Sequence, residues 1–363
     1  MPASPDSTER TTPGTTTTTS ITTATTTLAI VDAATAWLSP DVIAWGATSG
    51  TVQRWLEPEL ERLDNANFGT QVCDAVVLPV SDPLLWANRV IGLPDGQWAL
   101  AGVRFRDRDL DRCFVDVIAT SLPPRPESLA ALTPVLEFFA DFAPKRLRVT
   151  VPDPDLFAAS DDPAAPDTEV DLRVVATPLD GSASSTVSST SSPEALPEAP
   201  STEGVTLVDA TPQDAAARAE RIYGRIAADK PVLLEWSHPS TADYLTDPAE
   251  EGLLFTVRLH DEDAGVLALR RQDDYGLAGW LVEEKCVDPA FQGHNLSAAA
   301  SALAMERLAA HPDSAAIRDA GSRPVLWGHI HKDNVPSLRS AFAVGRRTVG
   351  GYLWVTPEGY PGF

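Results

Sequence analysis

Residues 282–308 read VEEKCVDPAFQGHNLSAAASALAMERL and join the end of an apolar strand, a polar loop and an Ala-rich helix. A loop that enters a helix presents backbone N–H groups that have no intrahelical partner. Together with the positive end of the helix dipole, these donors attract an anion such as a pyrophosphate. We therefore interpret the junction as a candidate phosphate site, with an ordinary strand-to-helix turn as the alternative.

The loop residues suit the close approach of a phosphate to the backbone. Gly293 adopts positive φ without steric cost, and Asn295 enters the left-handed region more readily than most residues. Ser297, at the start of the expected helix, is small. The loop alone is a weak signal, so the interpretation depends on the elements around it.

The elements on both sides of this loop predict a mixed α/β fold for residues 204–363. Apolar periodicity and turn residues indicate the order β-α-β-β-β-α-β-α-β. The first helix is expected to begin at Thr211-Pro212, an N-cap residue followed by Pro at the first helical position. The fourth strand of this order ends at the loop, and the Ala-rich helix follows at once.

Three motifs in this half resemble the GNAT superfamily of acyl-CoA-dependent N-acyltransferases. The stretch VDPAFQGHNLS is similar to the family's acyl-CoA loop, V-x-P-x-x-[RQ]-x-x-G-x-[GA], in which Val287, Pro289 and Gln292 match. Asn295 stands where Gly is usual, and Ser297 stands where Gly or Ala is usual. The Ala-rich helix and the strand VLWGHIH then follow in the family's order.

The third motif is HKDNVPSLRSAFAVGRRTVGGYLWV, which resembles the late segment of the family. Asn334, Ser337 and Gly345 lie at the expected offsets. The resemblance covers about residues 204–358 and implies a mostly antiparallel central sheet with flanking helices. It also implies acetyl-CoA as the acyl donor, with pantetheine in a gap where the strand containing EEKCV splays from its neighbour. The implied coenzyme A contacts are Lys285, Val287, Gln292, Gly293, His294, Asn295, Leu296, Ser297, Asn334 and Ser337.

Two acids in the strand are the candidate catalytic residues. In the implied reaction a neutral amine attacks the thioester, and a carboxylate accepts its proton directly or through water. Glu283 and Glu284 lie where many family members carry such an acid. Because successive strand residues face opposite sides, we expect at most one to face the acceptor, with Glu283 as the first choice. The alternative is a pair of solvated acids at a strand end.

One family feature is missing. A Tyr in the last helix often protonates the departing thiolate in this family, but Ala341 occupies that offset from Asn334. Arg346 replaces the usual aromatic residue after Gly345, and Tyr352 or water is left as a substitute acid. The departures keep a second hypothesis open, a catalytically inactive tandem GNAT-like protein that binds acyl-CoA or acts as a scaffold. A purely structural α/β protein is the third.

The first half, residues 28–152, also reads as mixed α/β, and its order of elements allows a degenerate copy of the same fold. Its strand-to-helix junction is TSLPPRPESLAAL, and the prolines remove N–H donors that a pyrophosphate needs. We therefore expect this half not to bind coenzyme A well. It would instead shape the acceptor site or pack against the second half, as in tandem GNAT proteins with one active half.

Two segments of biased composition set the expected domain boundaries. Residues 1–27 are Thr-rich and are expected to be a disordered tail, because they cannot bury enough apolar surface to offset their ordering entropy. Residues 153–203 read as a Ser/Pro/Glu-rich linker. Within it, EVDLRVVATPL has a strand as its alternative interpretation. The two segments divide the chain into domains 28–152 and 204–363.

Charge and composition restrict the partners. The net charge of -23 disfavours nucleic acid and anionic lipid, and no signal peptide or transmembrane segment is expected, which favours the cytoplasm. A small-molecule amine or a protein amine is the expected acceptor, and the chain is expected to be a monomer or homodimer. Cys73, Cys113 and Cys286 are expected to be reduced thiols. His329 and His331 share a strand face, but a third metal ligand is not evident.

Overall fold

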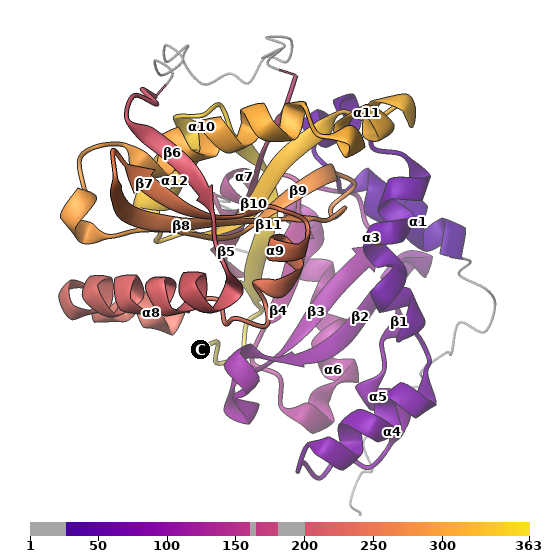
Figure 1. The fold of residues 1–363 in the computed structure, drawn as a ribbon. Helices are drawn as coiled ribbons and strands as arrows, with labels where there is room; N and C mark the ends of the chain where they lie inside the picture. Colours follow the sequence, from indigo (N-terminus) through magenta and orange to yellow (C-terminus); the bar gives the residue numbers. More distant parts are fainter. Residues whose placement is uncertain (1–26, 160–164, 181–199) are drawn as a thin grey trace, which may run out of the picture.

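The computed structural model describes residues 27–159, 165–180 and 200–363, which form one mixed α/β body around an eleven-stranded sheet (Figure 1). The strand order is β1-β2-β3-β4-β11-β5-β10-β9-β8-β7-β6. Residues 1–26 of the expected Thr-rich tail lie outside the described residues, while Thr27 begins the first helix. None of the helices in the described ranges has the length and apolar character needed to cross a bilayer.

The second half has the predicted order of elements. Thr211 caps the first helix as expected, because its hydroxyl accepts a hydrogen bond from the Asp214 N–H (3.2 Å). The strands are β6 (Val205–Asp209), β7 (Leu254–Leu259), β8 (Glu262–Arg271), β9 (Ala278–Val287), β10 (Pro324–His331) and β11 (Arg347–Thr356). The helices are α8 (Pro212–Asp229), α9 (Thr246–Glu250), α10 (Leu296–Ala309), α11 (Pro312–Asp319) and α12 (Val335–Phe342), with short 3-10 turns η6 (Pro231–Glu235) and η7 (Pro289–Phe291).

The first half contains four strands before the segment expected as a linker. They are β1 (Arg89–Gly92), β2 (Trp98–Phe105), β3 (Cys113–Thr120) and β4 (Leu147–Val151). The helices that precede them are α1 (Thr27–Ala36), α2 (Pro40–Ala44), α3 (Ser49–Glu61), α4 (Ala66–Ala75) and α5 (Pro83–Trp86). Of these helices, only α3 is predicted by the sequence, through the helical spacing of the apolar residues in TVQRWLEPELERL. The 3-10 turns η1 (Pro94–Gly96), η2 (Arg106–Arg108) and η3 (Leu110–Arg112) join the strands.

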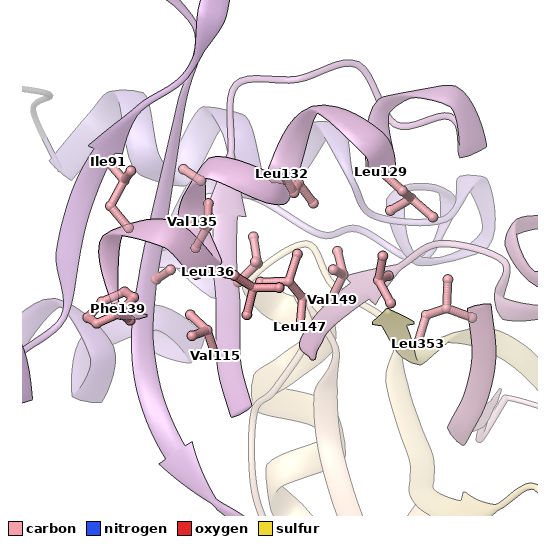
Figure 2. Close-up of a cluster of buried hydrophobic side chains, with 14 of the residues drawn as sticks. Ile91, Val115, Leu129, Leu132, Val135, Leu136, Phe139, Leu147, Val149 and Leu353 are labelled. Carbon is pink, nitrogen blue, oxygen red and sulfur yellow. The ribbon is translucent and has the colours of Figure 1, made fainter. Parts of the chain in front are cut away.

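The crossover from β3 to β4 is broken near Pro134. Its sequence, ESLAALTPVLEFFADFA, predicts a helix that Pro134 either kinks or restarts. The crossover consists of η4 (Pro126–Leu132), α6 (Thr133–Phe138) and η5 (Ala140–Phe142), because Pro134 cannot donate to a helix running through it. Figure 2 shows the apolar side chains of this crossover, including Leu132 and Leu136, packed toward the sheet. The same cluster contains Leu353 of β11, so both halves share one core here.

The structure differs from the expected linker 153–203. Residues Pro154–Ala158 form α7, and Asp167–Pro178 form the long strand β5, while 181–199 lie outside the described residues. β5 pairs antiparallel with both β10 and β11, and β11 also pairs antiparallel with β4. The apolar run Val174–Ala176 is fully buried there, and this burial outweighs the polar composition of its surroundings. The sheet is therefore interleaved at its centre, where β11 lies between β4 and β5, and β5 lies between β11 and β10.

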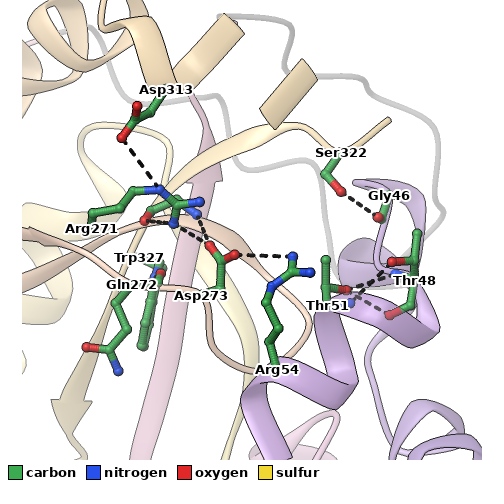
Figure 3. Close-up of polar contacts among 11 residues, drawn as sticks. Gly46, Thr48, Thr51, Arg54, Arg271, Gln272, Asp273, Asp313, Ser322 and Trp327 are labelled. Carbon is green, nitrogen blue, oxygen red and sulfur yellow. Dashed lines mark hydrogen bonds and ion pairs between the residues drawn. The ribbon is translucent and has the colours of Figure 1, made fainter. Parts of the chain in front are cut away.

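The helices before β1 also contact the second half (Figure 3). A capping box between Thr48 and Thr51 starts α3 and fixes its direction. Arg54 of that helix pairs with Asp273 in the β8–β9 turn (3.3 Å), and Asp273 also pairs with Arg271. The hydroxyl of Ser322 donates to the Gly46 carbonyl (2.9 Å). These contacts hold the region of α2 and α3 against the β8–β9 turn and against the segment that precedes β10.

Candidate functional site

Strands β9 and β10 run parallel and then separate. They pair over four residues, from Pro324↔Ala278 to Trp327↔Leu281, and neither strand pairs with the other beyond that point. The paired end is tight, because a β carbon on Gly279 would lie 2.0 Å from the Val325 carbonyl oxygen. Among the described residues, the backbone groups of residues 282–287 that face β10 therefore have no strand partner, which leaves them available to a ligand. The predicted splay is confirmed.

A cavity of about 530 Å³ opens where the strands separate. A second hollow of about 680 Å³ adjoins it and shares Arg106, Trp236 and His331 with it. Both halves build the wall of the first cavity. Its lining includes Val282, Glu283, Glu284 and Lys285 of β9, Gly328, His329 and His331 of β10, Asn334 and Ser337 around the start of α12, and Arg106, Phe114, Arg148 and Asp171 of the first half.

Both candidate acids line this cavity, although strand alternation had predicted that only one would. The β8–β9 pairing skips a residue, because Ala268 opposes Glu284 and Leu269 opposes Val282. Glu283 is therefore the extra residue of a β-bulge, and a bulge disrupts regular alternation. The bulge explains how two adjacent side chains reach one cavity.

Glu284 is the more buried of the two acids, with 3% of the residue exposed. One of its carboxylate oxygens accepts a hydrogen bond from the Tyr223 hydroxyl of α8 (3.2 Å), and the other accepts from the Ser240 N–H (2.9 Å). Burial raises the pKa of Glu284 above its ordinary value, despite these hydrogen bonds. Glu283 instead forms an ion pair with Arg270 (3.1 Å).

Lys285 extends from β9 toward the helices on the other face. Its ammonium donates to the Ser340 hydroxyl of α12 (3.0 Å) and lies 3.5 Å from the Ser301 hydroxyl of α10. Ser297 in the first turn of α10 also donates to Ser340 (3.2 Å). Burial, and then the charge of Arg346, lower the pKa of Lys285 to about 7. Lys285 and Ser297, both expected at the coenzyme site, are thus brought together.

The loop between β9 and α10 is open to solvent. Gly293 has φ of +89° and Asn295 has φ of +54°, as their residue types allow. The Asn295 side chain does not cap the helix, so the first N–H groups of α10 are left for solvent or a ligand. Among the other expected contacts, Gln292 and His294 are exposed, Val287 is half-buried and Leu296 is buried in the core beneath the loop.

Asn334 has a structural task in addition to lining the cavity. Its side-chain oxygen accepts a hydrogen bond from the Ser337 N–H (3.2 Å) and caps α12. Ser337 lines the cavity next to it. Ala341, at the offset expected for a catalytic Tyr, is fully buried and carries no polar group toward the cavity.

A polar network lies beside the cavity, and the sequence singled out only His329 and Tyr352 among its members. The Tyr275 hydroxyl bonds His329 Nε2 (2.8 Å) and donates to the Tyr352 hydroxyl. Arg148 lies over the Tyr352 ring at 4.3 Å and forms two hydrogen bonds with Asp116 (2.8 and 2.9 Å). The available signal was a charge inside each of two apolar strands, CFVDVIAT and LRVTV.

The network holds its members in defined protonation states. Burial, followed by the charges of Arg148 and Arg346, lowers the pKa of His329 to about 4. The residue is exposed to solvent on the cavity side, but its ring packs against the rings of Tyr275, Trp327 and Tyr352. With the lowered pKa, the imidazole is neutral at physiological pH. Burial raises the pKa of Tyr352 to about 12. A neutral hydroxyl and a neutral imidazole therefore lie on the first-half side of the site.

The two histidines of β10 do not converge on a metal site. His331 stacks on Trp236 with ring centroids 4.6 Å apart, whereas His329 bonds Tyr275. Across the residues that the structure describes, no group of three or more His, Cys, Asp or Glu could hold a metal ion. The three cysteines are free thiols, with Cys113 and Cys286 buried and Cys73 half-buried.

Structural comparison gives neighbours at low similarity, whereas sequence comparison gives no match. No family model matches the chain, and no curated protein matches it in sequence. A GCN5-related N-acetyltransferase from Sphaerobacter thermophilus is 15% identical with a TM-score of 0.43, over 76% of this chain and 81% of that chain. A GNAT-family acetyltransferase from Colwellia psychrerythraea is 12% identical with a TM-score of 0.41, over 81% and 97%.

A tandem GNAT protein from the clavulanic acid biosynthesis pathway is 16% identical with a TM-score of 0.36, over 82% of this chain and 96% of that chain. Structural neighbours of the chain are GNAT acetyltransferases, including this tandem protein, at low sequence identity.

Proposed function

We propose that the chain is an acyl-CoA-dependent N-acyltransferase that binds its donor in the gap between β9 and β10. The observation that carries this proposal is the course of the gap. Where β9 ends, the gap faces the exposed loop and the free N–H groups at the start of α10. Toward the closed end, where β9 and β10 meet, a cavity lined by carboxylates adjoins it. The first end suits the phosphates of a coenzyme A thioester, and the second suits proton transfer from an attacking amine.

In this proposal the free backbone groups of β9 pair with the pantetheine amides. A backbone N–H near Lys285 polarises the thioester carbonyl, where negative charge develops during attack. Glu284 accepts the proton of the amine, since its raised pKa makes the carboxylate a better base than an exposed one. The carbon–sulfur bond then breaks, the amide forms, and the thiolate takes a proton from water. The acceptor is a small-molecule or protein amine, and acetyl-CoA is the donor suggested by the loop motif.

One observation favours the second hypothesis, an acyl-CoA-binding protein without turnover. Ala341 presents a buried methyl group at the place where a general acid was expected. The two functions share the donor site and differ in the chemical step, so binding and turnover must be measured separately.

The test begins with calorimetric titration of acetyl-CoA into the full chain. We expect binding in the wild type and a loss of at least about tenfold in affinity in Gly293→Pro, because proline removes one N–H donor and cannot adopt φ of +89°. Gly359→Pro is the matched control, since Gly359 has φ of +88° and an equally open environment away from the loop. No binding to the wild type would refute the proposal. Binding without acyl transfer to a panel of amines would favour the second hypothesis.

A further inference from the structure

Arg346 lies at the point where β9 and β10 separate. A β carbon built on Gly328 would lie 2.8 Å from Arg346 Nη2 and 3.4 Å from the β carbon of Val282. Gly328 and Val282 directly follow the last pair of the parallel ladder, Trp327↔Leu281. The guanidinium therefore rests on the backbone at the closed end of the gap, where the absence of a side chain on Gly328 gives it room.

This guanidinium is buried with little compensation. Arg346 is 3% exposed, its Nη2 donates to the Val175 carbonyl of β5 (3.0 Å), and its Nε has no hydrogen-bond partner among the described residues. Burial lowers the pKa of Arg346 to about 9, so the group still carries its charge at neutral pH. A buried cation without an anion is costly, and proteins pair such groups or supply a ligand.

The acids of the cavity do not compensate Arg346, because each has another partner. Among the described lining residues, these pairs are Glu283 with Arg270 (3.1 Å), Glu284 with Tyr223 (3.2 Å), Asp171 with Arg106 (3.8 Å) and Asp107 with Arg112 (2.9 Å). Arg148, the other buried guanidinium of the lining, is neutralised by Asp116.

Lys285 is a second cation of the same cavity without an acid partner in the described part of the chain. Its two hydrogen-bond partners are the neutral hydroxyls of Ser340 and Ser301. Arg346 is close enough to contribute to the lowered pKa of Lys285, which means that the two positive charges repel each other. An anion between or beside them would relieve that repulsion.

We propose that Arg346 and Lys285 form a subsite for a carboxylate carried by one of the two reactants, at the closed end of the gap between β9 and β10. The inference rests on the proposed function. The phosphates would lie beyond the other end of β9, and the acyl group is at the opposite end of the coenzyme from them. The acyl group therefore reaches toward Arg346, which favours a dicarboxylic acyl donor. An acceptor with its own carboxylate is the second source of the same chemistry.

The experiment compares acetyl-CoA with succinyl-CoA by calorimetry on the full chain. We expect succinyl-CoA to bind about tenfold or more tightly than acetyl-CoA, because its free carboxylate gains a charge-assisted hydrogen bond to the guanidinium. In Arg346→Met the ratio of the two dissociation constants should fall to about one. Arg347→Met is the matched control, since the neighbouring guanidinium pairs with Asp41 at the surface (2.7 Å), and it should keep the wild-type ratio.

A second arm separates the sources. If the wild-type ratio is already about one, an amino acid acceptor is compared with its carboxamide in acyl transfer. A KM about tenfold lower for the acid, lost in Arg346→Met, assigns the subsite to the acceptor. No preference for a carboxylate in either arm overturns the subsite, while binding of acetyl-CoA leaves the proposed function intact. Failure of every acyl-CoA to bind refutes the proposed function instead.

Folding of the variants is checked by thermal unfolding. Arg346→Met should be at least as stable as the wild type, because it removes a buried charge that lacks an anion. Should that variant fail to fold, Lys285→Met provides the same comparison of dissociation constants. A folded Lys285→Met protein with an unchanged preference for a carboxylate would remove Lys285 from the subsite.

Discussion

In each half of the molecule, two parallel strands separate and leave a gap between them. In the first half, side chains occupy this gap. In both, three antiparallel strands are followed by a crossover and a parallel strand: β1-β2-β3 then β4, and β7-β8-β9 then β10. Both carry a bulge on the third strand. Ala101 opposes Val117 and Leu100 opposes Ala119, which makes Ile118 the counterpart of Glu283.

The contents of the two gaps differ. The β3–β4 ladder ends at Val117↔Val149. Trp37, directly after α1, and Trp55 of α3 line the space beyond it, where a cavity of only about 10 Å³ remains. The Trp37 indole N–H donates to the Leu122 carbonyl (2.9 Å), at the Pro-rich junction that follows β3. The apolar pair Ile118-Ala119 stands where the second half has two acids. A duplicated frame thus yields one filled gap and one gap suited to a ligand.

The largest expected effect concerns the acids that distinguish the two gaps. Glu284→Gln should lower kcat by about 10²–10⁴-fold, because it removes the group that we propose as the acceptor of the amine proton. The wild-type rate should fall as pH decreases through the raised pKa of Glu284, since protonation removes the base, and this acid limb should vanish in the variant. Steady-state kinetics over pH provide the measurement. Glu283→Gln is the control, and a larger loss there would transfer the role to Glu283.

The second effect concerns stability, and it tests the side chains that fill the gap of the first half. Trp37→Ala should lower the free energy of unfolding by about 3–5 kcal/mol, because it empties a buried aromatic site and removes the hydrogen bond to Leu122. Urea denaturation measures this loss. Leu28→Ala, at an exposed position of the preceding helix α1, should change the free energy of unfolding by less than about 0.5 kcal/mol. The emptied gap should still not bind acyl-CoA, because its junction is Pro-rich. New binding there would contradict that account.

The third effect concerns Lys285, whose charge has no counterpart in the gap of the first half. Lys285 lies two residues after the bulge, where the first half has the uncharged Thr120. Because the pKa of Lys285 is lowered to about 7, the unfolded chain binds more protons than the folded chain from about pH 7 up to the ordinary lysine pKa of about 10.4. Wild-type stability should therefore rise with pH across this window.

The rise is measured relative to Lys285→Met by denaturant titration at several pH values. It should approach about 1.4 kcal/mol per pH unit at most, the linkage value for one proton. Parallel stability curves for the two proteins would show that the amine is not perturbed in the folded state.

Local signals predicted the part of the fold near the loop. The Thr211 cap, the Ala-rich helix and the positive-φ residues Gly293 and Asn295 depend on neighbours in sequence, and the structure has them as expected. The splay of β9 followed from the family resemblance. The place of β5 could not be predicted, because its partners β10 and β11 lie far away in the chain.

The candidate site was predictable only in part for the same reason. Arg148 reaches the cavity from a strand of the other half, where it is paired with Asp116, and no spacing within residues 204–363 points to either residue. The joint placement of Glu283 and Glu284 depended on a bulge that strand alternation does not reveal. Arg346 was noted as a departure from a motif, yet its position against Gly328 required the three-dimensional arrangement.

The position of β11 between β4 and β5 has a consequence for folding during synthesis. A ribosome synthesises β11 last of the described strands, yet β11 lies in the interior of the sheet between β4 and β5. Until it emerges, the facing edges of β4 and β5 have no hydrogen-bond partner. Unpaired edges invite pairing with other chains. Correct folding therefore requires β11 to pair with β4 and β5 before another chain pairs with their edges.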